Sequence, residues 1–160
     1  MTQFEPAVMA LASALRTRGW KIATAESCTG GLIAAACTAV AGSSDWFERG
    51  FVSYSNEAKA ELLGVPMALI QAHGAVSAEV ARAMADGALE HSHAQLAVAV
   101  TGIAGPGGAT PGKPVGTVWL ALARAGGASA QAELLTLAGD RAAVREQTVR
   151  HALQRLTENT

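Results

Sequence analysis

The sequence predicts an α/β fold: a three-layer sandwich with a mixed, partly parallel sheet and helices on both faces. Residues 21–25 resemble a strand and lead through a turn of small residues into an apolar helix, an order typical of α/β domains. Residues 96–100 are apolar without interruption, which indicates a strand covered on both faces. Residues 115–123 and 133–137 predict two further strands, and the turn at Gly126–Gly127 between them favours an antiparallel pair.

The first third of the chain also predicts two helices and a second strand. Apolar residues recur at helical spacing between residues 6 and 18, and Gly19 follows in the usual C-terminal position. Residues 32–40 are almost all small and apolar, as in a buried helix. Residues 42–45 are predicted to form a loop, and residues 50–53 a short strand.

Three helix starts are predicted in the remainder of the chain. Ser55 or Asn56 caps a short helix that runs to Leu63, where Gly and Pro residues follow. Ser77 opens a longer helix, and Asp140 caps the final one. No repeat or linker interrupts the pattern, so residues 1–160 are expected to form a single domain.

Composition excludes partners that depend on a strong overall charge. The formal net charge is −1, which favours neither nucleic acid nor an anionic membrane as a partner. Half of the residues are hydrophobic but only 4% are aromatic, as expected for closely packed helices on a sheet. An anionic ligand must therefore be held by local groups rather than by the field of the whole protein.

The sequence is expected to be that of a soluble cytoplasmic protein. The N-terminal residues lack the pattern of a signal peptide, and no apolar run approaches the roughly 18 residues that span a bilayer. Cys28 and Cys37 are predicted to be reduced thiols rather than a disulfide.

The first candidate site is the turn Glu26–Gly31. A helix that starts there directs unpaired amides, and the positive end of its dipole, toward a bound anion or a developing oxyanion. The turn offers two adjacent nucleophiles: Ser27, which needs a partner to take its proton, and Cys28, whose pKa the helix terminus would lower. The alternative is that Ser27 or Thr29 is only an N-cap and that Cys28 is a small buried thiol.

The second candidate is the pair Tyr54 and Lys59. A tyrosine at a strand end and a lysine on the following helix can converge on one point, and either can act as a base if its pKa is depressed. The alternative is that Lys59 is a solvated lysine on a short surface helix.

The third candidate is the loop 101–108 with the segment 111–116. Its glycines suit a nest of amides around a phosphate, and it follows a buried strand, where α/β domains commonly bind ligands. It is neither a P-loop nor a dinucleotide fingerprint, because the required spacings are absent. The alternative is a long structural connection.

The fourth candidate is Arg141, directly after the predicted cap Asp140. A cation there opposes the helix dipole, and a bound anion would offset that unfavourable interaction. An exposed arginine paired with Asp140 or solvent is the alternative. The four histidines have no partners at ligand spacing, so neither a metal site nor a Ser-His-Asp triad is predicted.

Most of these candidate residues lie in five segments that together resemble one family, and the similarity ends with residues 139–141 (GDR), which include Arg141. In chain order the segments are residues 24–31 (TAESCTGG), 50–59 (GFVSYSNEAK), 74–77 (GAVS), 99–108 (AVTGIAGPGG) and 113–116 (KPVG). Over essentially the whole chain, the sequence is similar to the CinA C-terminal domain family, which also occurs alone as bacterial nicotinamide mononucleotide deamidase. Five motifs in a fixed order are far more specific than any one of them.

The resemblance implies a serine-type amidohydrolase that converts nicotinamide mononucleotide to nicotinate mononucleotide and ammonia in pyridine nucleotide recycling. It further implies a homodimer, a small-molecule nucleotide substrate, and no metal or organic cofactor. It identifies Ser27 as the nucleophile and places Tyr54, Lys59, Thr101 and Arg141 in the active site, leaving open which group is the base.

The resulting hypothesis assigns the other residues to substrate binding. Amides of the turn Cys28–Thr29–Gly30–Gly31 hold the oxyanion, and Ser44 lines the rim of the pocket. The 5′-phosphate and ribose are held by Thr101, Gly102, Gly105 and Arg141. The alternative function is a non-catalytic nucleotide-sensing or partner-binding module of the competence/damage-inducible CinA type.

Overall fold

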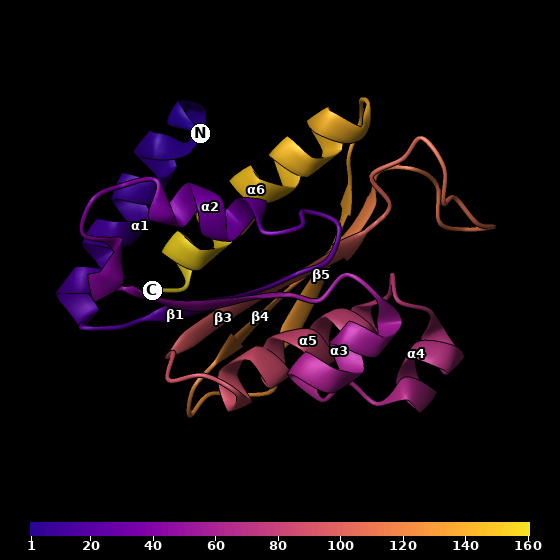
Figure 1. The fold of residues 1–160 in the computed structure, drawn as a ribbon, viewed down its shortest axis with the longest axis horizontal. Helices are drawn as coiled ribbons and strands as arrows, with labels where there is room; N and C mark the ends of the chain where they lie inside the picture. Colours follow the sequence, from indigo (N-terminus) through magenta and orange to yellow (C-terminus); the bar gives the residue numbers. More distant parts are fainter.

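A computed structural model describes residues 1–160, which fold into one five-stranded sheet with helices on both faces (Figure 1). The strands are β1 Ile22–Glu26, β2 Phe47–Val52, β3 Leu96–Gly102, β4 Thr117–Arg124 and β5 Gln131–Thr136. The helices are α1 Glu5–Arg18, α2 Leu32–Thr38, α3 Asn56–Leu63, α4 Met67–His73, α5 Ala78–Glu90 and α6 Arg141–Glu158, with short 3-10 helices η1 Thr2–Phe4 and η2 Ser43–Asp45.

The sheet is mixed, as predicted. Its strand order is β2-β1-β3-β4-β5. β1 pairs in parallel with both β2 and β3, whereas β3 with β4 and β4 with β5 are antiparallel. Helices α1, α2 and α6 cover one face and α3, α4 and α5 cover the other (Figure 1), which confirms the three-layer sandwich.

The two faces of the sheet carry side chains of different size. In β3, Leu96, Val98 and Val100 point toward α1, α2 and α6, whereas Ala97 and Ala99 point toward α5. Successive side chains of a strand alternate between faces, so the alanines form a nearly flat surface. That surface lets α5 pack closely on the sheet, which explains how a core with few aromatic residues fills its space.

The predicted helix caps are confirmed, and the differences lie in short elements. The side chains of Ser55, Ser77 and Asp140 each accept a hydrogen bond from an amide in the first turn of α3, α5 and α6. Helix α4 was not predicted from the sequence, and η2 forms where a loop was predicted. Both elements are seven residues long or shorter, too short to show a clear helical period.

The topology brings several segments to one edge of the sheet. Because β1, β2 and β3 run in parallel, their carboxyl ends share an edge. The connection from β1 to β2 lies on one face of the sheet, and the connection from β2 to β3 lies on the other. Ligands of open α/β sheets bind at such a switch point.

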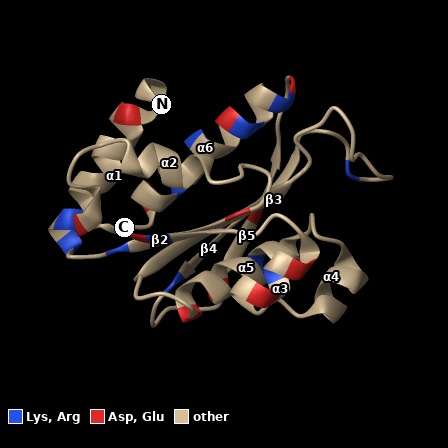
Figure 2. Cartoon of the chain, in the orientation of Figure 1, with Lys and Arg blue, Asp and Glu red and all other residues tan.

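Lys and Arg lie beside Asp and Glu on α1, α3 and α6 rather than gathering on one face (Figure 2). None of the helices has both the length and the apolar character needed to cross a bilayer.

Candidate active site

The side chains of Ser27 and Lys59 meet at the carboxyl ends of β1 and β2. Ser27 directly follows β1, and its amide donates to the carbonyl of Val100 in the neighbouring strand β3 (3.0 Å). Lys59 lies in the first half of α3, which starts four residues after β2 ends. The Nζ atom of Lys59 is 3.1 Å from Oγ of Ser27, so the two side chains are within hydrogen-bond distance.

Lys59 is buried, with only 1% of its surface exposed. Its Nζ also donates to the carbonyls of Ser53 (3.1 Å) and Tyr54 (3.0 Å). Burial lowers the pKa of Lys59 from its ordinary value, because the charged amine loses solvation. When neutral, the amine donates its two N–H groups to these carbonyls and keeps a lone pair for the Ser27 hydroxyl. The alternative of a solvated surface lysine is therefore wrong.

The turn after Ser27 is organised by the buried side chain of Glu26. The carboxylate accepts hydrogen bonds from Oγ1 of Thr29 (2.6 Å) and from the amides of Ile33 (2.8 Å) and Ala34 (3.0 Å). The prediction that bare amides of a helix beginning at this turn face the ligand is thus wrong in detail. Helix α2 begins only at Leu32, and Glu26 caps its first amides.

Amides without an acceptor lie within the turn itself. The amide of Gly30 donates to the carbonyl of Ser27, whereas the amides of Cys28, Thr29 and Gly31 donate to no protein group. Gly30 and Gly31 both have positive φ values, 60° and 99°, a conformation in which successive amides can face the same side. The turn therefore has the donors that an oxyanion requires, although they do not belong to the helix.

The structure contradicts the prediction that the pKa of Cys28 is lowered. Cys28 is 5% exposed, and burial raises the pKa of its thiol to about 12. Loss of solvation outweighs the favourable charges of Arg145 and Lys59. Cys37 is also a free, buried thiol. Cys28 is thus the small buried thiol that the sequence left as the alternative.

Tyr54 and Arg141 form a second pair at the same edge. Tyr54 is 59% exposed, and its hydroxyl accepts a hydrogen bond from Nη2 of Arg141 (3.3 Å). Nη1 of Arg141 donates to the carbonyl of Gly105 (2.9 Å). Gly105 has φ +84°, and an added Cβ would lie 2.6 Å from Cγ1 of Val115, so only glycine fits there. The hydroxyl of Tyr54 is bonded to Arg141 rather than to Ser27.

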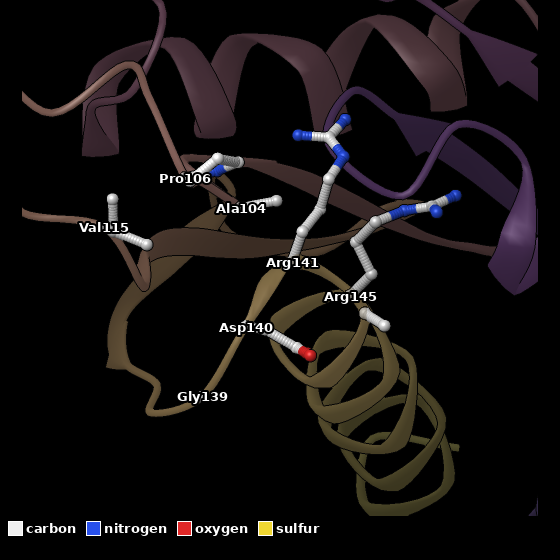
Figure 3. A pocket seen from close by; sticks show the side chains of 8 residues that line it. Ala104, Pro106, Val115, Gly139, Asp140, Arg141 and Arg145 are labelled. Atoms are coloured by element: carbon white, nitrogen blue, oxygen red, sulfur yellow. The ribbon is translucent and has the colours of Figure 1, made fainter.

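A cavity of about 720 Å³ lies beside this pair. Its lining comes from the N-terminal end of α6 and from the loop after β3, and includes Arg141 and Arg145. Figure 3 shows the two guanidinium groups extending from α6 in the same direction, with Asp140 turned away from them. Two guanidinium groups at a helix N-terminus favour an anionic ligand. Ser27 and Lys59 are not in the lining, so the cavity adjoins their site rather than enclosing it.

A family model described as the CinA C-terminal domain matches residues 5–160. The chain belongs to the CinA C-terminal domain family. This confirms the resemblance inferred from the five motifs. Among solved structures, the competence/damage inducible protein CihA from Agrobacterium tumefaciens has a TM-score of 0.93 and 45% identity, and the match covers 97% of this chain and 94% of that one.

Relatives within the CinA family differ in length and in name. Nicotinamide-nucleotide amidohydrolase PncC from Escherichia coli K12 is 53% identical over 143 residues, which are 89% of this chain and 86% of that protein. A putative competence-damage inducible protein from Symbiobacterium thermophilum is 60% identical over 146 residues, 87% of this chain. The chain spans only 34% of that relative, and likewise 34% of a CinA-like protein from Citrifermentans bemidjiense.

Two of the CinA-motif residues have structural contacts in this chain. Thr101 is buried, and its hydroxyl donates to the carbonyl of Ala75 (2.9 Å), which joins the end of β3 to the segment before α5. Gly102 packs against β4: an added Cβ would lie 2.6 Å from Cγ2 of Val118 and 2.9 Å from the carbonyl oxygen of Thr117. Thr101 and Gly102 thus fix the start of the loop that carries Gly105.

Within one chain the structure does not place Ser44 beside Ser27, and a role for Ser44 at the rim of the pocket stays a prediction. Ser44 is exposed in η2, next to Trp46, whose carbonyl accepts the amide of Ile22 at the start of β1. Ser27 follows the opposite end of β1, roughly 16 Å away at the rise of an extended strand. No three His, Cys, Asp or Glu side chains gather in a metal-binding group.

Arg145 was not predicted from the sequence as a site residue. It lines the cavity together with Arg141, and its Nη2 donates to the carbonyl of Thr29 in the turn after Ser27 (3.0 Å). The available signal was its spacing: a residue four positions after Arg141 lies on the same helix face.

Proposed function

We propose that this chain is a nicotinamide-nucleotide amidohydrolase in which Ser27 is the nucleophile and Lys59 is the general base. The 53% identity to a protein named for that activity supports the reaction. The observation that carries the mechanism is the 3.1 Å separation of Ser27 Oγ and Lys59 Nζ in a buried site. Lysine acts as a base only when neutral, and its burial favours that form.

In the first half of the reaction, Oγ of Ser27 attacks the carboxamide carbon while Lys59 takes the hydroxyl proton. The carboxamide oxygen becomes an oxyanion, and amides of Cys28, Thr29 and Gly31 are the available donors. Lys59 then returns the proton to the nitrogen, the C–N bond breaks, and ammonia leaves. The product of this half is a nicotinoyl ester on Ser27.

In the second half, water hydrolyses the ester. Neutral Lys59 takes a proton from the water as its oxygen attacks the ester carbon, and then gives a proton to Oγ of Ser27 as the ester bond breaks. Nicotinate mononucleotide leaves, and the enzyme returns to its starting state. Neither half of this reaction requires a redox step or an external cofactor.

The cavity beside the site accounts for the nucleotide part of the substrate. Arg141 and the N-terminus of α6 bind the 5′-phosphate there, with the loop around Gly105 against the ribose. The carboxamide then reaches from the cavity to Ser27. The exposed ring of Tyr54, whose hydroxyl is held by Arg141, lies at the junction of the two regions.

The experiment that tests this proposal is an assay of ammonia release from three amides: nicotinamide mononucleotide, its nucleoside and free nicotinamide. We expect turnover to be fastest with the mononucleotide, because only that substrate has a phosphate for the cavity. Binding of the mononucleotide without ammonia release would instead support the non-catalytic nucleotide-sensing alternative. Fast turnover of free nicotinamide would show that the cavity has no role in substrate choice.

The same proposal places the chain in pyridine nucleotide recycling, as a homodimer in the cytoplasm. Sedimentation of the purified protein tests the dimer, with a monomer at micromolar concentration as the contrary result. The reaction consumes the mononucleotide and releases a nicotinate nucleotide. The enzyme that acts next must therefore accept a nucleotide whose pyridine ring carries a carboxylate.

A further inference from the structure

Arg145 connects two parts of the site that the sequence places far apart. It lies one helical turn after Arg141 in α6, and its side chain reaches the turn after Ser27, where Nη2 donates to the carbonyl of Thr29 (3.0 Å). An added Cβ on Gly30 would lie 3.9 Å from the same Nη2 atom, so the guanidinium group packs directly on the turn. Arg145 also lines the cavity (Figure 3).

The donors of Arg145 are divided between these two parts. Nε is buried and has no partner, and it shares the edge of the guanidinium plane with Nη2, which is bonded to Thr29. Nη1 has no protein partner either, but unlike Nε it is not buried. One edge of the planar group thus faces the turn, and the remaining donor is free for an anion in the cavity.

The Thr29 carbonyl is part of the peptide unit that precedes Gly30, within the short segment that carries the unpaired amides. Gly30 and Gly31 have positive φ values and little intrinsic stiffness, so this segment needs external contacts to hold one conformation. Glu26 holds it from one side through Oγ1 of Thr29, and Arg145 holds it from the other through the carbonyl.

We propose that Arg145 is a positioning residue: it fixes the oxyanion-binding turn through Thr29 while its free donor contacts the anionic group of the substrate in the cavity. The inference rests on the proposed amidohydrolase function. It assigns Arg145 two separable effects, one on turnover through the turn and one on binding through the anion. Arg141, which does not contact the turn, has only the second effect.

The test uses three variants on the same helix. Arg145→Met removes both effects, whereas Arg145→Lys keeps a positive charge but lacks the planar fork that bridges the turn and the cavity. Arg150→Met is the matched control, because Arg150 is exposed and pairs only with Glu146 and the ring of Phe4. The readouts are kcat for ammonia release and the inhibition constant of inorganic phosphate, with circular dichroism to confirm folding.

We expect kcat to fall between about 10- and 100-fold in both Arg145 variants, since misplaced transition-state donors have effects of that size. Phosphate inhibition should weaken about tenfold or more in Arg145→Met, the effect of one charge-assisted hydrogen bond, and change little in Arg145→Lys. The control should match the wild type in both. Wild-type kcat in either Arg145 variant overturns the positioning role, and unchanged phosphate inhibition in Arg145→Met overturns the anion contact. A wild-type protein that releases no ammonia would contradict the proposed function instead.

Discussion

Replacing Lys59 by methionine tests the assignment of the base. Methionine fills most of the same unbranched space but can neither accept the proton of Ser27 nor donate to the carbonyls of Ser53 and Tyr54. Two opposing changes affect stability: the carbonyls of Ser53 and Tyr54 lose their donor, and a buried amine no longer has to be desolvated. The variant should therefore remain folded, which leaves the chemical effect measurable.

The expected loss of activity follows from the role of Lys59 in both halves of the reaction. A positioned general base contributes about 10²- to 10⁴-fold, which is about 2.7–5.4 kcal/mol of the barrier at 1.36 kcal/mol per factor of ten. Lys59 is the only base within hydrogen-bond distance of Ser27 Oγ, so we expect kcat for Lys59→Met to fall by about 10³-fold or more.

The assay is ammonia release from nicotinamide mononucleotide at saturating substrate, with thermal unfolding followed in parallel. Lys21→Met is the matched control, because Lys21 is exposed at the opposite edge of the sheet. We expect that control to retain wild-type kcat. A folded Lys59→Met protein whose kcat is within tenfold of the wild type would refute the reasoning, and Tyr54 would then have to be tested as the base.

Three further predictions concern the pH profile, the thiol and the packing of the helices. Burial lowers the pKa of Lys59, and the active form is neutral, so kcat/KM should rise with pH and level off below the ordinary lysine value of 10.5; a profile that still rises at pH 10.5 contradicts this. Cys28→Ala should keep kcat within about threefold, and the native thiol should resist alkylation at pH 8, because its pKa is about 12. Gly87→Ala should lower the free energy of unfolding by about 1–3 kcal/mol in a denaturant titration, since its Cβ would overlap the carbonyl oxygen of Leu63; unchanged stability would show that α3 can shift freely.

The fold was largely predictable because its long elements have strong local patterns. The apolar run of β3 and the caps of α3, α5 and α6 are visible in the sequence. The strand boundaries of β4 and β5 were predicted to within two residues. Large and small side chains alternate along β3, so the sequence predicts that one face of the sheet carries larger side chains than the other. Only the folded chain shows which helices pack on each face.

Some of the residues that gather at the candidate site were predictable from the sequence, but their contacts were not. Ser27, Tyr54 and Lys59 lie in the motifs, and the parallel strands β1 and β2 bring their segments to one edge of the sheet. Arg141 reaches that edge from the start of α6 and contacts the hydroxyl of Tyr54. The burial of Lys59 was missed, because the apolar surroundings of one helix position come from other parts of the chain.

The contacts of Glu26 and Arg145 were missed for a similar reason. Glu26 lies in the same motif as Ser27, and its carboxylate accepts the first amides of α2. A single sequence does not show whether a glutamate at this position caps the helix or faces the ligand. Arg145 meets Thr29 across 116 positions of the chain, a distance that no local pattern spans.

The central claim is that the hydroxyl of Ser27 forms a covalent ester with the substrate. The most direct measurement is kcat for ammonia release by Ser27→Ala, in a protein shown by circular dichroism to be folded. We expect a loss of about 10³-fold or more, because both halves of the reaction pass through that oxygen. Turnover within tenfold of the wild type would contradict the covalent mechanism and leave attack by water as the remaining route.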